Sequence, residues 1–328
     1  MNQNETNRMD NRVTIRSLSE YLKFIEDVVS SKEISSVPML YYRGEADATW
    51  EKKAALFRGK SEDTFNLKDA NWSIEKDLIN SALTVYPDAF GKCPNAISRL
   101  VKMQHYFLPT RLYDVTSNPL IALYFACSGE FGKDGMVLFT KSDVRLTSLD
   151  DVTILADLAE LLDVSDKSVK NMFDYLRVYD RIPAASNEQS LERFLFKYVT
   201  ESLLFQPPMD NERIKRQQGA LIFSALMKPF DNENEYQIMK QELESTNVIS
   251  EKMKELPFSK CHEVDLRTMF DDNCFYINKD DKVRILQELD SIGINEGFVY
   301  PDLEHQMKTI KFKNLPKNNF EYDLNKVY

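Results

Sequence analysis

Glycine, cysteine and histidine are scarce in this sequence, and each scarcity excludes a class of protein. The 328 residues include 9 Gly, about 3% against a usual figure near 7%, which disfavours a fold built on many tight glycine turns. The 4 Cys form no CxxC pair, which excludes a disulfide scaffold and indicates a reducing, cytoplasmic compartment. The 3 His belong to no zinc-binding motif, so the sequence predicts no metal site.

Long apolar runs and a positive net charge are also absent. No stretch of 18 apolar residues occurs and residues 1–12 are polar, so we expect a disordered N-terminal tail and no membrane segment. Lys and Arg total 42 against 52 Asp and Glu, a net charge of -10. That charge argues against capture of nucleic acid by the surface as a whole and leaves a local basic groove open. The glycine-rich phosphate-binding motifs are missing as well.

The apolar content is sufficient for a large core. Hydrophobic residues make up 43% of the chain, with 20 Phe and 15 Tyr, so the chain is a folded protein of one large domain or two ordinary ones. A helix is expected within residues 13–37, where Ser17 and Glu20 have the spacing of a capping box. Residues 228–256 are the most charged stretch and are interpreted as an insertion or a connection between subdomains.

Hydrophobic periodicity predicts the remaining elements. A short buried strand is expected over residues 39–42, ending at Arg43. From 110 to 116 the period is two, which predicts an extended segment with Asp114 and Thr116 on one side. Further strands are predicted over 135–140 and 220–225. Helices are predicted over 74–85, 95–105, 118–126, 149–162, 169–178, 191–205 and 281–289.

Polar side chains gather just before the helix predicted at 118–126. The segment QHYFLPTRLYDVTSNPL contains Gln104, His105, Thr110, Arg111, Asp114 and Thr116. A helix N-terminus presents unpaired N–H groups and partial positive charge, and Arg111 adds a fork of donors, so the segment is predicted to bind a phosphate or a carboxylate. The alternative is that Arg111 and Asp114 pair with each other and with the backbone, since buried charges need partners.

Two further polar residues stand beside apolar strands. Arg43 follows the strand at 39–42 and precedes a glycine, a position that presents a side chain to a cleft. The alternative is an arginine at a strand end that is simply exposed to water. Gln218 precedes the strand at 220–225 and follows three basic residues, which are either part of a site or a solvated turn.

Four blocks of the sequence resemble the FRG-domain family, which is named for a Phe-Arg-Gly or Tyr-Arg-Gly signature. In the family's order they are YYRGEADATWEKKAALFR, VKMQHYFLPTRLYDVTSNPLIALYFA, NERIKRQQGALIF and LDSIGINEGFVYPDLEHQ, spanning about residues 40–305. Three positions depart from the family pattern. Tyr42 replaces the signature Phe, Phe107 replaces the usual Gly, and Val115 stands where Trp is common.

The FRG resemblance implies a divergent branch of the ADP-ribosyltransferases, proteins that split NAD and transfer ADP-ribose to a macromolecule. The implied fold is α+β, with an ADP-ribosyltransferase-like split β-sheet core and many surrounding helices. It occupies an FRG-type domain over residues 38–328, with a helical insert at about 141–205. NAD is the implied co-substrate, without a metal. The implied catalytic residues are Arg43, Thr110, Asp114 and Gln218, and the implied cofactor-binding residues are Arg43, Tyr42, His105, Arg111, Tyr113 and Thr116.

Cleavage of the nicotinamide–ribose bond builds oxocarbenium character, so the site must anchor the pyrophosphate, fix the ribose hydroxyls and present an acceptor. Arg43 and Arg111 suit the pyrophosphate, and Thr110 or Asp114 suits the ribose hydroxyls. Gln218 suits a hydroxyl or the acceptor. The aromatic rings of Tyr42 or Tyr113 would stack on nicotinamide or adenine.

The implied biological role is that of an intracellular toxin or phage-defence effector, with RNA favoured over protein as the acceptor and an antitoxin or inhibitor protein as a partner. The alternatives are a non-catalytic module that recognises a nucleotide or a nucleic acid, and an enzyme that hydrolyses NAD. Residues 150–166 hold six carboxylates and no Lys or Arg. An acidic helix face there would dock a basic partner, or would only be solvated.

Overall fold

The computed structural model of the chain describes residues 13–30, 40–58, 72–140, 146–161, 174, 176–178, 201–209, 211–225, 241, 266–270, 273–303, 305–307 and 310. The predicted tail at 1–12, most of the insert at 141–205 and nearly all of the charged segment at 228–256 lie outside the described residues.

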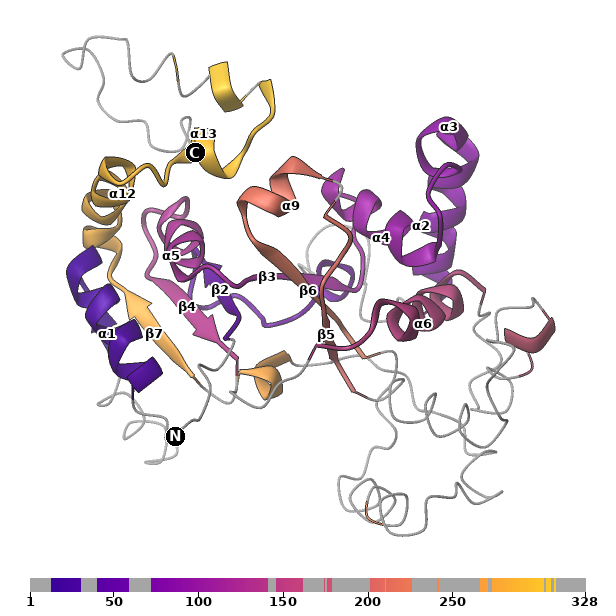
Figure 1. Cartoon of the computed structure of the whole chain (residues 1–328), viewed down its shortest axis with the longest axis horizontal. Coiled ribbons are helices and arrows are strands. Elements are labelled where there is room, and N and C mark those ends of the chain that lie inside the picture. Colours follow the sequence, from indigo (N-terminus) through magenta and orange to yellow (C-terminus); the bar gives the residue numbers. More distant parts are fainter. Residues whose placement is uncertain are drawn as a thin grey trace.

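Among the described residues, seven strands form one sheet with helices around it (Figure 1). The strands are β1 (Thr14–Ile15), β2 (Tyr42–Glu45), β3 (Leu112–Thr116), β4 (Gly135–Phe139), β5 (Leu203–Phe205), β6 (Gly219–Phe223) and β7 (Cys274–Ile277). The longer helices are α1 (Leu18–Ser30), α2 (Trp72–Val85), α4 (Ala96–His105), α5 (Pro119–Cys127), α6 (Leu149–Leu161) and α12 (Lys282–Ser291), and shorter ones are α3 (Pro87–Phe90), α9 (Glu212–Arg216) and α13 (Glu296–Val299). The strand order is β1-β7-β4-β2-β3-β6-β5, parallel at β1–β7 and antiparallel elsewhere. The fold is α+β, as the sequence predicted.

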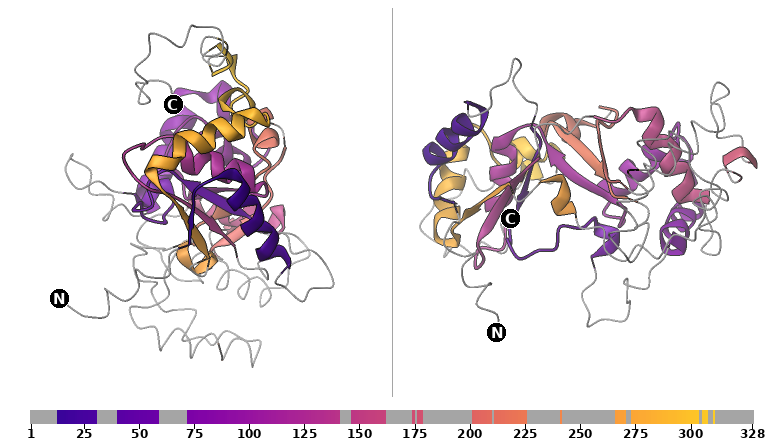
Figure 2. Two further views of the ribbon diagram at one scale, coloured as in Figure 1. Left: turned by 90° about the vertical axis from the view of Figure 1, so that its left-hand side faces the viewer. Right: turned by 90° about the horizontal axis from the view of Figure 1, so that it is seen from below.

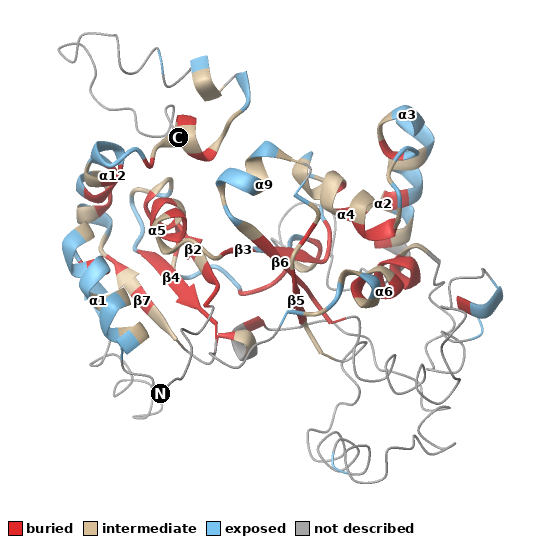
Figure 3. Ribbon diagram, in the orientation of Figure 1, coloured by how far each residue is buried: buried red, intermediate tan, exposed pale blue. Residues whose placement is uncertain are grey.

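The helices cover the sheet in two groups. Helices α1, α5 and α12 pack on the half formed by β7, β4 and β2, where the core includes Tyr42 and Phe139. Helices α2, α4 and α6 pack on the half formed by β3, β6 and β5, where the core includes Leu112 and Phe223. The views of Figures 1 and 2 agree that α1 and α12 lie side by side at the β7 end, and the amide of Leu18 donates to Glu288 of α12. Figure 3 shows that the strands and α5 are mostly buried.

Both helix groups lie on the same face of the sheet. Tyr42 of β2 is directly opposite Thr116 of β3, and residues directly opposite each other in an antiparallel ladder point to the same face. Thr116, Asp114 and Leu112 share that face because side chains alternate along a strand. The other face buries Tyr113 and Val115 beneath the turn Leu266–Met269.

The two halves of the sheet meet at a junction with little backbone pairing. Strand β2 pairs with β4 at all four of its residues and β3 pairs with β6 at all five, whereas β2 and β3 are in register only at Tyr42 and Thr116. Beyond that pair the ladder between β2 and β3 is open. This opening positions the candidate site.

Helix α5 forms where the sequence predicted it. The Asn118 side chain accepts a hydrogen bond from the amide of Leu120 at 2.9 Å, and Pro119 occupies the first helical position. A Cβ atom on Gly44 would lie 1.8 Å from the carbonyl oxygen of Ala122. Strand β2 can therefore approach α5 closely only because residue 44 is glycine.

Some element predictions are wrong. Strand β2 runs through Glu45, so Arg43 lies within it and not after its end. Residues 203–205, predicted as the end of a helix, form strand β5 and pair with β6. Strands β1 and β7 were not predicted. Strands of two and four residues are too short for periodicity to identify them.

The acidic stretch 150–166 does not present the expected uniform face. Asp157 of α6 is 4% exposed. Glu160 accepts hydrogen bonds from Nε of Arg99 at 2.5 Å and from its Nη2 atom. These contacts hold α6 against α4, so the predicted docking face is absent at Asp157 and Glu160, and Asp163 lies outside the described residues.

Candidate functional site

Asp114 is the exposed member of an otherwise buried strand. The residues of β3 are buried except Asp114, whose side chain is 67% exposed. Its side chain lies on the helix-covered face, in the gap between the two helix groups. There it lines a pocket of about 220 Å³ together with residues of α4, β6 and the turn that joins α9 to β6. Of the predicted site residues on β3, Asp114 is the one that lines this pocket.

Arg43 reaches the same place from the other face of the sheet. Its neighbour Tyr42 points into the helix-covered core, so Arg43 starts on the opposite face. Nη1 of Arg43 donates to the carbonyl oxygen of Asp114 at 3.0 Å and lies 3.8 Å from the Asp114 carboxylate. The guanidinium thus occupies the opening between β2 and β3 and takes the place of a backbone donor. Its side chain is 17% exposed.

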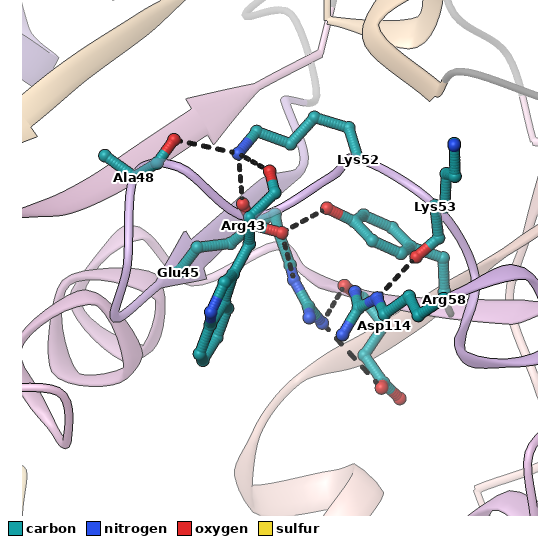
Figure 4. A network of polar contacts seen from close by, with 9 residues as sticks. Arg43, Glu45, Ala48, Lys52, Lys53, Arg58 and Asp114 are labelled. Atoms are coloured by element: carbon teal, nitrogen blue, oxygen red, sulfur yellow. Dashed lines mark hydrogen bonds and ion pairs between the residues drawn. The ribbon is translucent and has the colours of Figure 1, made fainter. Parts of the chain in front are cut away.

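A buried carboxylate beneath Arg43 organises this part of the site (Figure 4). Glu45 is fully buried and accepts hydrogen bonds from Lys52 Nζ at 2.5 Å and from Tyr113 Oη at 2.7 Å. Its Oε1 atom is 3.7 Å from Nε of Arg43. Burial, with the adjacent Glu45 carboxylate, raises the pKa of the Tyr113 hydroxyl. The phenol therefore stays protonated and donates to Glu45.

Arg58 supplies a second guanidinium next to Arg43. The Cζ atoms of Arg43 and Arg58 lie 4.4 Å and 5.8 Å from the centroid of the Tyr113 ring, within the range of cation–π contact. Nε of Arg58 donates to the carbonyl of Lys53 at 2.8 Å. Burial and the nearby Arg43 cation lower the pKa of Arg58. Two close guanidinium groups favour an anion between them.

The pocket around Asp114 has a polar wall contributed by α4, α9 and the turn that follows α9. His105 of α4, Arg213 of α9 and Gln217 line it. The guanidinium of Arg213 lies 4.9 Å from the ring centroid of Tyr300, which in turn stacks on His305 at 4.6 Å. Gln217 donates through Nε2 to the carbonyl of Val299 at 3.2 Å. The C-terminal block of the FRG resemblance therefore borders the pocket.

Arg111 is not part of this site. It is 1% exposed, and its Nε atom donates to Glu75 Oε2 at 2.7 Å while Nη2 contacts the same oxygen. The alternative interpretation was right that Arg111 forms an ion pair, but the partner is Glu75 of α2 and not Asp114. The predicted role in binding a pyrophosphate is contradicted, because the guanidinium is consumed by a buried ion pair.

Three other predicted residues have structural contacts. Thr110 is buried and its hydroxyl bonds to Gln104 at 3.0 Å. The hydroxyl of Thr116 donates to the carbonyl of Gln217 at 2.6 Å and accepts from the amide that follows Ser117. The ring of Tyr42 is buried in the core against Phe139. These side chains hold the walls in place and are not exposed to a ligand.

The glutamine at the site is not the predicted one. Gln218 is exposed in a turn with φ of 46° and does not line the pocket, whereas Gln217 does. A shift of one residue at the entry to β6 cannot be seen from periodicity, because the turn between α9 and β6 decides which side chain faces inward.

Sequence reasoning missed Glu45, Lys52, Arg58 and Gln217. A signal existed for the first three, since they lie in the block YYRGEADATWEKKAALFR that carries the signature. Charged residues directly after an apolar strand are candidates for a buried network, but only the fold shows that this loop returns over Tyr113.

Comparison with known proteins agrees with the signature. Residues 38–135 match the family model of the FRG domain. This matched segment contains β2, the network around Glu45, β3 and α5, and it is the part of the chain that the FRG-domain family model covers. No curated protein and no solved structure matches the chain.

The described residues contain neither a metal-binding cluster nor a membrane-spanning helix. No cluster of three or more His, Cys, Asp or Glu side chains within the described ranges is arranged to hold a metal ion. None of the helices that the structure describes combines the length and apolar character needed to cross a bilayer.

Proposed function

We propose that this FRG-domain protein is an NAD-dependent ADP-ribosyltransferase that modifies a macromolecular acceptor inside the cell, as a toxin or a defence effector. The observation that carries the proposal is the opening between β2 and β3, in which the Arg43 guanidinium faces the exposed carboxylate of Asp114. A sheet divided by such an opening is the core that the family resemblance implies for ADP-ribosyltransferases.

The charges in the opening suit a dinucleotide. Arg43 and Arg58 would hold the two phosphates of the pyrophosphate, because a guanidinium fork matches phosphate oxygens. The adjacent pocket of about 220 Å³ would take one ring of the dinucleotide with its ribose. Asp114 is the exposed acceptor available to the ribose hydroxyls.

The proposed reaction breaks the bond between the ribose C1′ atom and the nicotinamide nitrogen, which leaves with the bonding electron pair. The carboxylate of Asp114 would stabilise the positive charge that develops on the ribose. A nucleophilic atom of the acceptor then forms the new bond to C1′ and loses its proton to solvent or to a neighbouring base. Gln217, whose amide is anchored on Val299, would orient the acceptor or a hydroxyl.

The decisive experiment supplies purified protein with NAD labelled in the adenylate half, together with cellular RNA and protein. We expect label to be retained on a macromolecule. Release of all label as free ADP-ribose would instead identify an NAD glycohydrolase, and unchanged NAD would identify a non-catalytic module. A matched control is Arg284→Ala, which removes an exposed arginine of α12 outside the opening.

A further inference from the structure

Phe107 is held in a costly conformation with its ring in water. It has φ of 65° and is 86% exposed. It follows α4 at the position where a helix usually ends in glycine: the amide of Leu108 donates to Met103 O at 3.0 Å and that of Phe107 to Gln104 O at 2.9 Å. A bulky residue in this left-handed region is an outlier, and such outliers cluster at functional sites.

The ring of Phe107 lies at the edge of a continuous groove between α4 and α9. It lines the pocket that contains Asp114, and a second pocket of about 350 Å³ adjoins that one through the shared residues Val101, His105 and Ile214. Another ring at the border, Tyr106, is 63% exposed. The groove therefore leads from the carboxylate of the candidate site outward past two exposed aromatic rings.

The groove is basic although the chain is acidic. Its lining residues include Lys92, Arg213 and Lys102, whose Nζ donates to the carbonyl of Ala89 at 2.5 Å. Asp114 is the single carboxylate among the residues that line the two pockets. The net charge of the chain is -10. Arg216 of α9 adds exposed positive charge beside it, whereas Lys215 is paired with Glu212 at 2.8 Å. The groove therefore favours an anionic ligand.

We propose that this groove binds a single-stranded nucleic acid, with unpaired bases stacked on Phe107 and Tyr106 and phosphates near Lys92 and Lys102. Aromatic platforms combined with a positively charged groove are how proteins bind single strands. A duplex keeps its base faces inside its own stack, so the exposed rings would have no partner in it. Because the groove ends at Asp114, the strand is also the class of acceptor for the proposed transferase, and that last step rests on the proposed function.

The test measures binding without NAD, so that it stands apart from catalysis. The probes are a fluorescein-labelled 12-nucleotide RNA, the matching DNA and their duplexes, followed by fluorescence anisotropy at several salt concentrations. Binding of either single strand, with the duplex at least about tenfold weaker, supports the groove and identifies which strand it takes. Failure of both single strands to bind, or equal binding of the duplexes, overturns it.

Variants of the ring and of the lysines sharpen the test. Phe107→Gly removes the ring and relieves the left-handed backbone, so it should weaken single-strand binding about tenfold while raising the melting temperature, and Phe107→Trp should retain binding. The double variant of Lys92→Gln and Lys102→Gln should lower the slope of log K against log salt by about 0.7 for each phosphate that the protein no longer neutralises. Lys23→Gln, on the exposed side of α1, should change neither the affinity for single strands nor the salt slope. Unchanged binding by Phe107→Gly would overturn the proposal. If the strand binds and NAD is never consumed, the groove stands and the proposed function fails.

Discussion

The guanidinium of Arg43 and the carboxylate of Asp114 start on opposite faces of the sheet and come within 3.8 Å of each other. They meet because β2 and β3 are in register at one residue pair and diverge beyond it. Arg43 therefore has two roles: it closes part of the opening by donating to the backbone of Asp114, and it carries the positive charge exposed there.

Arg43→Ala should abolish NAD consumption, because the opening loses its central cation. It should also lower the free energy of unfolding by about 2 kcal/mol, the scale of a hydrogen bond to a charged group. Arg43→Lys should restore the charge without restoring activity, since an ammonium lacks the guanidinium fork. NAD turnover and urea unfolding measure the two effects, and retained turnover in Arg43→Ala would contradict the assignment.

Glu45→Gln should destabilise the protein by about 3–5 kcal/mol, because it leaves Lys52 as a buried cation without its carboxylate partner. Adding Lys52→Met should recover much of that stability, since both charges are then removed. Activity should not recover in the double variant, because the carboxylate next to Nε of Arg43 is still missing. Recovery of both properties together would show that Glu45 serves the fold alone.

Arg111→Met should be as destabilising as any single change in the site region, about 3–5 kcal/mol, because it leaves Glu75 as a buried carboxylate without its arginine. Combining it with Glu75→Leu should return most of the loss, as both charges are then replaced by apolar groups. Chemical denaturation of the two single variants and the double variant forms a cycle. Additive losses would contradict a direct ion pair.

Gln217 and Gln218 form a matched pair of neighbours. Gln218→Gly should raise stability by about 1 kcal/mol, because residue 218 has φ of 46°, and should leave NAD turnover unchanged. Gln217→Ala should lower turnover, because Gln217 lines the pocket. Thermal melting and turnover separate the two, and a larger loss of activity in Gln218→Gly would restore the original sequence prediction.

The His105 imidazole should make stability depend on pH. Burial, with the nearby Arg213 cation, lowers the pKa of His105 below its usual range. The unfolded chain then binds a proton at about pH 6.5 that the folded chain binds only at lower pH, so the free energy of unfolding rises as pH increases through this window and is level above it. His105→Asn should flatten this segment of the profile. An unchanged slope in the variant would assign the effect to another group.

Features of the site that involve residues close together in the sequence could be predicted, whereas contacts between distant residues could not. The cap at Asn118, the apolar run of α5 and the extended segment that contains Asp114 are local features, and the structure has them where they were predicted. The partner of Arg111 is Glu75, 36 residues earlier. Nothing local indicates that α2 would return to this strand.

Strand register was the second feature of the site that the sequence did not predict. Whether Tyr42 or Arg43 faces the helices is fixed by the pairing of β2 with β4, and a shift of one residue exchanges the two faces. The same uncertainty led to Gln218 in place of Gln217. Blocks of the FRG resemblance contain both pairs of neighbours, but residue types alone did not tell which neighbour turned inward.

The strand order has a consequence for synthesis of the chain. The chain passes back and forth between the two halves of the sheet. Strands β2, β4 and β7 lie on one side of the opening, and β3, β5 and β6 lie on the other. The first strand, β1, pairs with β7, which begins at Cys274. On the ribosome, β1 must wait until β7 has emerged, so the sheet cannot be completed by progressive addition from the N-terminus. A nascent chain arrested before Cys274 would expose the apolar edge of β4, and slow translation there should increase its dependence on chaperones.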